Sequence, residues 1–307
     1  MHAVDRAQVA VGLGPFVPLR LVGAGACGNV IFAGQNRGIA FLTHDMKRIV
    51  LTLLMSTWLP GFAQAPPSHL DRVLAAKQLR VCIWPDYFGV TYRNPKTQLL
   101  SGIGIDLAND LARDLAVQPA FVDSSFASLA DDITRDRCDI AMFAIGITPE
   151  RSAKMQFSRP HLVSDIYAIT TRSNRQLAGW ADIDRPGVVV AVAQGTYHEA
   201  VMRGRLQHAT LLVTTSPQGR EQEVESGRAD VFMTDYPFSR RILETTDWAR
   251  LIAPASPFHP MPYAFAMPLG DSRWHTRVEA FVAAIKRDGR LLTAARRNKL
   301  EPIVVLD

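Results

Sequence analysis

The stretch RCDIAMFAIGITPERSAKMQFSRPHL, residues 137–162, carries the strongest structural signal in the sequence. Apart from Asp139, its run 138–145 is apolar and has the length and composition of one strand that is buried on both faces. Thr148 and Pro149 follow at the expected start of a helix, because proline fits the first helical position. Arg151 then lies just beyond the carboxyl end of the strand. The stretch therefore predicts a layered α/β fold with Arg151 at the edge of a sheet.

Strands and helices alternate on both sides of this stretch. Upstream, 79–83 predicts a buried strand, and Leu107, Leu111 and Leu115 recur on one face of a helix over 105–115. Downstream of the polar stretch 171–176 the same alternation starts again, which indicates two similar α/β units. The other expected strands are 121–122, 188–192, 211–214, 231–233 and 263–267, and the other expected helices are 129–135, 197–205, 220–226, 273–287 and 291–299.

Two lobes account for this order of elements. We expect two extended crossings between them, near 168–171 and 264–268, with strand 263–267 closing the second sheet. The first lobe then comprises 66–170 and 268–307, and the second comprises 171–267. In such an arrangement a ligand binds between the lobes, at the carboxyl ends of the strands.

The net charge of the chain is concentrated near its start. The formal charge is +5, but residues 1–65 hold five Lys or Arg and two Asp, and the remaining 29 basic and 27 acidic residues leave +2. No run of like charge stands out beyond residue 65, which argues against a nucleic-acid partner. The hydrophobic content of 48% is enough for one large or two medium globular units.

A secretory signal peptide is predicted over 46–65. Lys47 and Arg48 precede an apolar run, 49–59, and small residues follow at Ala63 and Ala65. The run is too short to cross a bilayer as a helix, so a cleaved leader is favoured over a membrane anchor. We therefore predict a periplasmic protein, and we interpret residues 1–45 as an over-long start without a fold of its own.

Cys82 and Cys138 are the cysteines beyond the predicted leader. Each lies in or beside an apolar run, where a free buried thiol is the commoner state, although an oxidising compartment leaves a disulfide open. We expect free thiols. The sequence has no CxxC or paired-histidine spacing, so we expect neither a metal nor a cofactor.

Five segments in register resemble a known family. They are DRVLAAKQLRVCIWPDY (71–87), SGIGIDLANDLA (101–112), the stretch 137–162, VAQGTYHEA (192–200) and SGRADVFMTDYP (226–237). Together they are similar to extracellular solute-binding proteins, family 3, the periplasmic components of ABC importers for polar amino acids. The resemblance implies an α/β, two-lobed periplasmic binding protein-like fold of type II, in which each lobe has a mostly parallel sheet flanked by helices and two strands form the hinge.

The resemblance also implies how a ligand carboxylate is held in the first lobe. Arg151 matches the arginine that grips it, since a guanidinium offers a planar fork of donors. Thr148 stands at the turn whose N–H groups would help to hold the anion. Ala144 and Gly146 replace hydroxyl residues common in this loop, so only their backbone groups remain for the ligand. The alternative for Arg151 is a surface arginine at the start of a helix.

The second lobe is expected to hold both ends of the ligand. Gly195 and Thr196 resemble the second carboxylate grip, and Asp235 matches the acid that receives the α-ammonium. Two structural alternatives stay open. Thr196 with Glu199 has the pattern of a capping box, and Asp235 precedes a proline as a loop cap often does.

Aromatic residues are expected around the body of the ligand. Tyr87 resembles the aromatic residue that covers it, and Trp84 stands where members that bind basic amino acids tend to carry an acid. Together with Phe88 and Phe143, these residues favour a neutral or aromatic amino acid, although at least one of them is expected to belong to the core. Asp106 is expected to support the first lobe near a helix start rather than to contact a ligand.

The function predicted from these residues is capture of a small amino acid or similar carboxylate by lobe closure and delivery to an ABC membrane permease, by a monomer without catalytic activity. One alternative is an enzyme similar to the cyclohexadienyl dehydratase-like members of the family, with His198 and Glu199 near the turn at Thr196. Against it, Glu199 has the capping position already described. A second alternative is a sensory protein whose lobes are recognised by a receptor.

Overall fold

The computed structural model describes residues 67–216 and 218–307. The predicted signal peptide, 46–65, and the predicted over-long start, 1–45, lie outside the described residues. Within the described part, two main sheets alternate with helices along the chain, as the sequence predicts. No helix in that part is long and apolar enough to cross a membrane.

The first sheet combines parallel and antiparallel strands. Its order is β5-β1-β6-β14-β7, and β8 pairs with β14. β1, β5 and β6 are parallel, whereas β14 runs antiparallel to β6, β7 and β8. Every residue of β6 is buried, which explains why its sequence is apolar throughout. The strands are β1 (Gln78–Ile83), β5 (Gln118–Asp123), β6 (Ile140–Gly146), β7 (Met155–Phe157), β8 (Leu162–Ser164) and β14 (Met261–Pro268).

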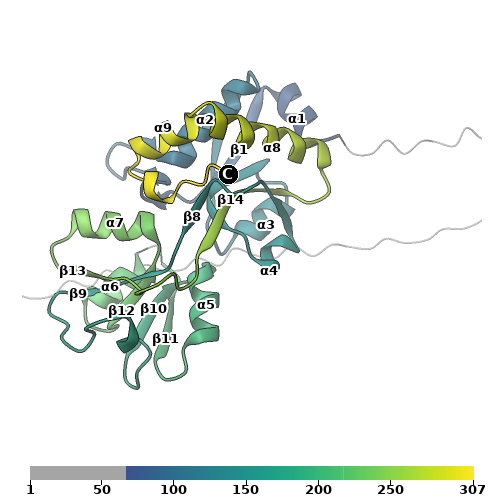
Figure 1. Ribbon diagram of the computed structural model, residues 1–307. Helices are drawn as coiled ribbons and strands as arrows, with labels where there is room; N and C mark the ends of the chain where they lie inside the picture. Colours follow the sequence, from purple (N-terminus) through teal and green to yellow (C-terminus); the bar gives the residue numbers. More distant parts are fainter. Residues whose placement is uncertain (1–66, 217) are drawn as a thin grey trace, which may run out of the picture. The chain divides into compact units, whose positions relative to one another are not determined.

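Helices from both ends of the described chain cover this sheet. α2 packs on the sheet through Leu107 and Leu111, and the C-terminal helices α8 and α9 lie beside α1 and α2 (Figure 1). The N-terminal and C-terminal parts therefore share one lobe. The helices are α1 (His69–Ala76), α2 (Ile103–Asp114), α3 (Leu129–Thr134), α4 (Pro149–Ser152), α8 (Ser272–Arg287), α9 (Arg290–Arg297) and the short 3₁₀ helix η2 (Glu301–Ile303).

A small antiparallel sheet follows β1 and holds one of the predicted site residues. It consists of β2 (Asp86–Tyr87), β3 (Thr91–Arg93) and β4 (Leu100–Ser101). Tyr87 pairs with Thr91 in this sheet, and the Tyr87 side chain is buried. The small sheet thereby fixes the backbone that carries Tyr87.

The second sheet has the order β11-β10-β12-β9-β13. β10, β11 and β12 are parallel, and β9 runs antiparallel to β12 and β13. Helices α5, α6 and α7 pack against it. The elements are β9 (Tyr167–Thr171), η1 (Trp180–Asp182), β10 (Val189–Ala193), α5 (Tyr197–Arg205), β11 (Thr210–Thr214), α6 (Gly219–Glu225), β12 (Val231–Thr234), α7 (Tyr236–Thr245) and β13 (Ala249–Ile252).

Strand 263–267 belongs to a different sheet from the one expected. It forms most of β14, which pairs with β6, β7 and β8 in the first sheet, so the expectation that it closes the second sheet is wrong. Both main sheets accept fully buried strands, and an apolar run does not reveal its pairing partner. The chain passes between the sheets after β8 and after β13. The lobe boundaries at 170 and 268 stay proposals, and the strand pairing favours earlier positions for both.

Cys82 and Cys138 form a disulfide, with their Cα atoms 5.6 Å apart. The expectation of two free thiols is therefore wrong. Cys82 of β1 pairs with Ala141 of the neighbouring strand β6, and Cys138 lies just before that strand. The resulting Cα separation lies in the range that a disulfide requires. A sequence separation of 56 residues contains no information about this register.

Candidate ligand-binding cleft

Side chains from both lobes meet around a small cavity of about 10 Å³. That volume is about what one water molecule needs. The first lobe and the strand β14 contribute one side of the lining, and α5, α6 and the residue after β12 contribute the other. The lining residues are Trp84, Tyr87, Phe126, Ala144 and Tyr263 on the first side, and Thr196, Tyr197, His198, Arg220 and Asp235 on the second.

Asp235 joins the two sides of the cleft. It is only 3% exposed, and it caps the start of α7 by accepting a hydrogen bond from the Phe238 N–H at 3.1 Å. Its Oδ2 accepts hydrogen bonds from the hydroxyls of Tyr87 and Tyr263, the latter at 3.0 Å. Burial raises the pKa of Asp235, because an apolar environment disfavours the charged carboxylate. Asp235 thus caps α7 through Oδ1, as the structural alternative predicts, and its Oδ2 faces the tyrosines of the cleft.

Arg151 lies between backbone groups of the two lobes. Its guanidinium donates from Nη1 to the Gly146 carbonyl at 2.9 Å and from Nη2 to the Gly195 carbonyl at 3.0 Å. It also stands 5.4 Å from the centre of the Phe126 ring. Burial lowers the pKa of Arg151. Arg151 is therefore a part-buried cation beside the turn at Gly195, not a surface arginine, although it does not line the small cavity itself.

The turn before α4 holds Arg151 as the sequence predicts. The Thr148 Oγ1 accepts a hydrogen bond from the Arg151 N–H at 3.3 Å, and Pro149 occupies the first helical position. Gly146 contributes its carbonyl to the guanidinium, and a Cβ there would lie 2.7 Å from Met261. Thr148 and Gly146 therefore contact Arg151 through hydrogen bonds, and neither residue lines the cavity.

The turn at Gly195 has a backbone conformation that favours glycine. Gly195 has φ +75°, and a Cβ there would lie 2.7 Å from backbone atoms of Ala127. Thr196 caps α5 by accepting from the Glu199 N–H at 3.4 Å, and Glu199 accepts from the Gly195 N–H at 2.8 Å. Thr196 is therefore the N-cap of α5, as the structural alternative predicts. The reciprocal half of the capping box is not formed, because Glu199 accepts from the Gly195 N–H while the Thr196 N–H donates to the Ala193 carbonyl. Glu199 also pairs with Arg203, at 2.8 Å, so its carboxylate is occupied outside the cavity.

The aromatic residues divide between the cleft and the core. The ring centres of Trp84 and Tyr87 lie 5.2 Å and 5.9 Å from that of Phe126, and all three residues line the cavity. Phe143 is fully buried behind Phe126, at 5.1 Å between ring centres. Phe143 thus belongs to the core, whereas Ala144 next to it reaches the cavity.

Sequence analysis did not select five of the lining residues as ligand contacts: Phe126, Tyr197, His198, Arg220 and Tyr263. Tyr197 and His198 adjoin the recognised Thr196, and Arg220 opens a helix that was expected only as a cover for the sheet. His198 is 4% exposed, and neither ring nitrogen has a hydrogen-bond partner among the described residues. Burial holds the pKa of His198 well below its ordinary value, so the ring is neutral at pH 7. Tyr197, His198 and Arg220 could have been selected as candidates because they follow strands of the second sheet, near whose carboxyl ends ligands bind in such folds.

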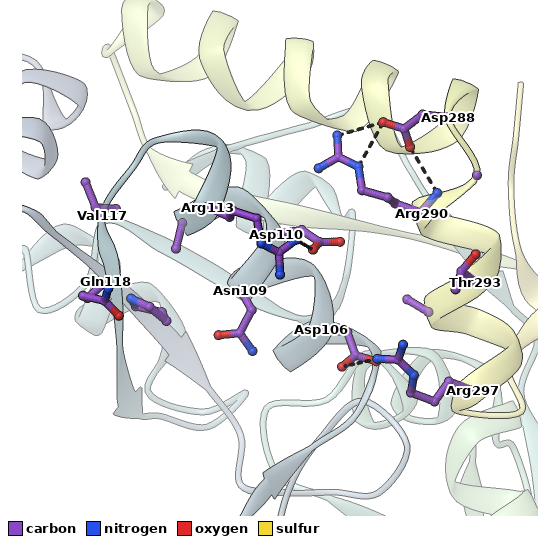
Figure 2. A pocket seen from close by; sticks show the side chains of 14 residues that line it. Asp106, Asn109, Asp110, Arg113, Val117, Gln118, Asp288, Arg290, Thr293 and Arg297 are labelled. Carbon is purple, nitrogen blue, oxygen red and sulfur yellow. Dashed lines mark hydrogen bonds and ion pairs between the residues drawn. The ribbon is translucent and has the colours of Figure 1, made fainter.

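Asp106 lies in a different place from this cleft. Its carboxylate pairs with Arg297 at 3.2 Å and accepts from the Asn298 amide at 3.0 Å. Figure 2 shows it in a surface pocket of about 760 Å³ between α2 and α9, where the labelled arginines face carboxylates. Asp106 therefore supports the contact between two helices of the first lobe, in agreement with its predicted role.

Comparison with known proteins agrees with this arrangement. The family model for bacterial extracellular solute-binding proteins, family 3, matches residues 79–298. The chain belongs to this family. The resemblance drawn from the five sequence segments is therefore confirmed, and so is the two-lobed α/β fold that it implies.

Relatives of this family 3 protein include both an enzyme and binding proteins. It is 31% identical over 229 residues to a cyclohexadienyl dehydratase from Pseudomonas aeruginosa, a match that covers 74% of this chain and 85% of the relative. It is 25% identical over 239 residues to a putative amino-acid ABC transporter-binding protein from Vibrio harveyi, with coverage of 76% and 94%. A crystal structure of an ancestral amino acid-binding protein, described as a precursor of cyclohexadienyl dehydratase, matches with a TM-score of 0.69 and 28% identity over 75% of this chain and 99% of that one.

Proposed function

We propose that this family 3 protein captures a small amino acid or a related carboxylate between its two lobes and delivers it to an ABC membrane permease. The observation that carries the proposal is the position of Arg151, which donates at once to Gly146 in the first lobe and to Gly195 in the second. A carboxylate that enters the cleft can replace these carbonyls as a charge-assisted acceptor.

Charges at the two ends of the cleft suit a zwitterion. Arg151 supplies a part-buried cation on one side, and Asp235 supplies a carboxylate that is almost fully buried on the other. The Asp235 carboxylate accepts hydrogen bonds from Tyr87 and Tyr263. A ligand ammonium would bring a positive charge to this acid, which favours its ionised form.

Binding requires the lobes to part and close again. A cavity of about 10 Å³ has no room for an amino acid. Since the contacts between Arg151 and Gly195 and between Tyr87 and Asp235 cross the cleft, they would break on opening and be replaced by ligand contacts on closing. A ligand stabilises the closed state by the difference between its contacts in the two states.

A dehydratase-like enzyme is the second candidate. Its support is the 31% identity to cyclohexadienyl dehydratase and the buried, unpartnered His198 in the cavity lining. Elimination of a hydroxyl needs a proton donor near the leaving oxygen, and a neutral imidazole carries one N–H. Glu199 is occupied by the Gly195 N–H and Arg203, so it is the weaker candidate of the two predicted residues.

Export and assembly belong to the same proposal. The predicted leader 46–65 would direct the protein to the periplasm, where a disulfide such as Cys82–Cys138 persists. We propose that the protein acts as a monomer that meets a membrane permease, with no nucleic-acid partner. A sensory role would use the same ligand cleft with a receptor in place of the permease.

A thermal-shift screen followed by an activity assay separates these functions. The purified protein is heated with each of the common amino acids, with 2-oxo acids and with prephenate. A ligand at 100 times its Kd stabilises the folded state by about 2.7 kcal/mol, which gives a clear rise in Tm. A rise without turnover supports transport or sensing, and conversion of prephenate supports the enzyme. If no acid in the panel raises Tm, the proposed function is wrong.

A further inference from the structure

The fully buried polar atoms that lack hydrogen-bond partners in the described lining of the cleft all lie on one side. Among the described residues that line it, these atoms are the Tyr197 hydroxyl, both ring nitrogens of His198 and Nε of Arg220. All three residues belong to α5 and α6 of the second lobe. Buried polar groups are normally paired with protein, water or ligand. The second lobe therefore offers a group of donors that the fold itself does not use.

Arg220 is the charged member of this group. It is 3% exposed, and its Nη1 donates to the Met233 carbonyl at 3.0 Å. Its guanidinium stacks over the Phe238 ring at 4.1 Å and near the Phe232 ring at 5.3 Å. These rings hold the guanidinium on the side that faces the core. Arg220 also lines the cavity.

Arg220 has a weak internal counter-ion. The nearest carboxylate oxygen is on Glu221, 3.7 Å from the Arg220 Nε, which is beyond hydrogen-bond distance. Neither oxygen of Glu221 has a hydrogen-bond partner among the described residues. A guanidinium binds a carboxylate best through parallel hydrogen bonds, and this pair does not form them. Arg220 therefore keeps donors for another acid.

His198 lies on the same side and complements Arg220. Its ring stacks on that of Tyr197, with 4.1 Å between the ring centres, so the imidazole is held in place. A neutral imidazole carries one donor and one acceptor nitrogen. It can donate to a carboxylate without adding a second buried charge beside Arg220.

We propose that Arg220 and His198 form an acid-binding subsite in the second lobe, so that the preferred ligand carries a second carboxylate on its side chain. This inference rests on the proposed function, in which Arg151 holds the first carboxylate. It replaces the neutral side chain expected from the sequence with an acidic one. The aromatic residues Trp84 and Phe126 then cover the carbon chain between the two acids.

The first test compares matched acids by titration calorimetry. Each dicarboxylate is paired with a monocarboxylate of similar shape: L-glutamate with L-norvaline, 2-oxoglutarate with 2-oxovalerate, and prephenate with phenylpyruvate. We expect the dicarboxylate of at least one pair to bind about tenfold or more tightly than its partner, because a buried charge pair contributes at least that much.

Variants connect this preference to Arg220. Arg220→Gln is expected to weaken the dicarboxylate about tenfold more than its monocarboxylate partner. Glu221→Gln is expected to act in the opposite direction and to tighten the dicarboxylate about threefold, because it removes a negative charge that competes for Arg220. Arg228→Gln is the matched control, since Arg228 is exposed and pairs with Glu223 outside the cleft.

The outcomes separate this inference from the proposed function. If monocarboxylates bind as tightly as their dicarboxylate partners, the acid subsite is wrong while amino-acid capture stands. If neither member of any pair binds while another acid of the thermal-shift panel does, the subsite is wrong and the proposed function stands; if no acid of that panel binds, both fail. Should Arg220→Gln not fold, Glu221→Gln decides, because unchanged or weaker binding of the dicarboxylate contradicts the subsite.

Discussion

The two sides of the cleft satisfy their polar groups in different ways. On the first side, the hydroxyls of Tyr87 and Tyr263 both bond to Asp235, and the other lining residues are Trp84, Phe126 and Ala144. On the second side, Tyr197, His198 and Arg220 retain unpartnered polar atoms. The first side is therefore mostly apolar and its two tyrosine hydroxyls are paired, whereas the second side has buried polar atoms without hydrogen-bond partners.

This difference indicates how the two lobes divide the work of binding. A surface whose groups are already paired gains little from new hydrogen bonds, so it contributes shape and apolar cover. A surface with unpaired buried donors gains most when a ligand brings acceptors to it. We infer that the first lobe is the stable scaffold with the Arg151 grip, and that the second lobe selects the ligand side chain. The predictions below test that division.

The largest expected effect concerns the stability of the first lobe. Replacing both cysteines by serine should lower the free energy of unfolding by about 4 kcal/mol, because the Cys82–Cys138 bond closes a long loop across a sequence separation of 56 residues. Urea denaturation measures the loss. Hydrogen exchange should show the largest increase in β1 and β6, and an equal increase in β10 and β12 would contradict the division.

The next effect concerns the grip of the first lobe. Arg151→Ala should weaken binding of any carboxylate more than tenfold, by about 2–3 kcal/mol, because it removes a charged donor from a buried site. Calorimetry measures the affinity, and a CD spectrum checks that the fold is intact. Lys154→Ala is the control, since Lys154 is exposed and close by in the chain. Unchanged binding by Arg151→Ala would assign the first carboxylate to another group.

Local patterns accounted for much of the fold and for part of the site. The apolar run before Arg151, the proline at Pro149 and the turn at Gly195 were predictable because a few neighbouring residues determine them. The structure places Asp235 in the cavity lining, and it places Arg151 nearby, with a hydrogen bond to the Gly195 carbonyl next to the lining residue Thr196. Their contact with a ligand stays a prediction.

Long-range features were not predictable in the same way. The pairing of β14 with β6 and the disulfide between Cys82 and Cys138 depend on register between distant strands. Arg220 opens a short polar helix, where an arginine is usually solvated. Its burial follows from stacking on Phe238, which comes from a different part of the chain. A single sequence does not contain these distances, so the second side of the cleft was the part most incompletely predicted.

Acid sensitivity provides a third test, through a buried histidine of the first lobe. Burial lowers the pKa of His161 to about 3, and its ring stacks 4.2 Å from that of Phe265. The neutral ring is therefore fully compatible with the folded state above pH 6.5, and stability is lost as pH falls from 6.5 towards 3, where only the unfolded state binds the proton. Between pH 7 and pH 5 this histidine should account for about 2 kcal/mol of lost stability.

His161→Phe should remove that part of the pH dependence without changing ligand affinity at pH 7, since His161 does not line the cleft. Denaturant curves at pH 7 and pH 5 measure the difference between variant and wild type. The same slope in both proteins would show that His161 is not the sensitive group. A change of affinity at pH 7 would contradict the separation of scaffold and cleft.

The smallest expected effect is at the start of α8, a helix of the first lobe that contacts α1 and α9. Asp271 caps this helix, accepts from the Trp274 N–H at 2.9 Å and from the His69 N–H at 2.7 Å, and these hydrogen bonds help to lower its pKa to about 2. Because the folded state favours the ionised form, the stabilisation is present above pH 3.8 and is lost as pH falls towards 2. Asp271→Asn should therefore lower the free energy of unfolding at pH 7 by about 1 kcal/mol, a value reduced for partial solvent exposure.

The difference from wild type should shrink as pH approaches 2, as Tm measurements across this range can show. Ligand affinity should not change, and a loss of affinity would mean that the scaffold and the selective side of the cleft are coupled rather than separate.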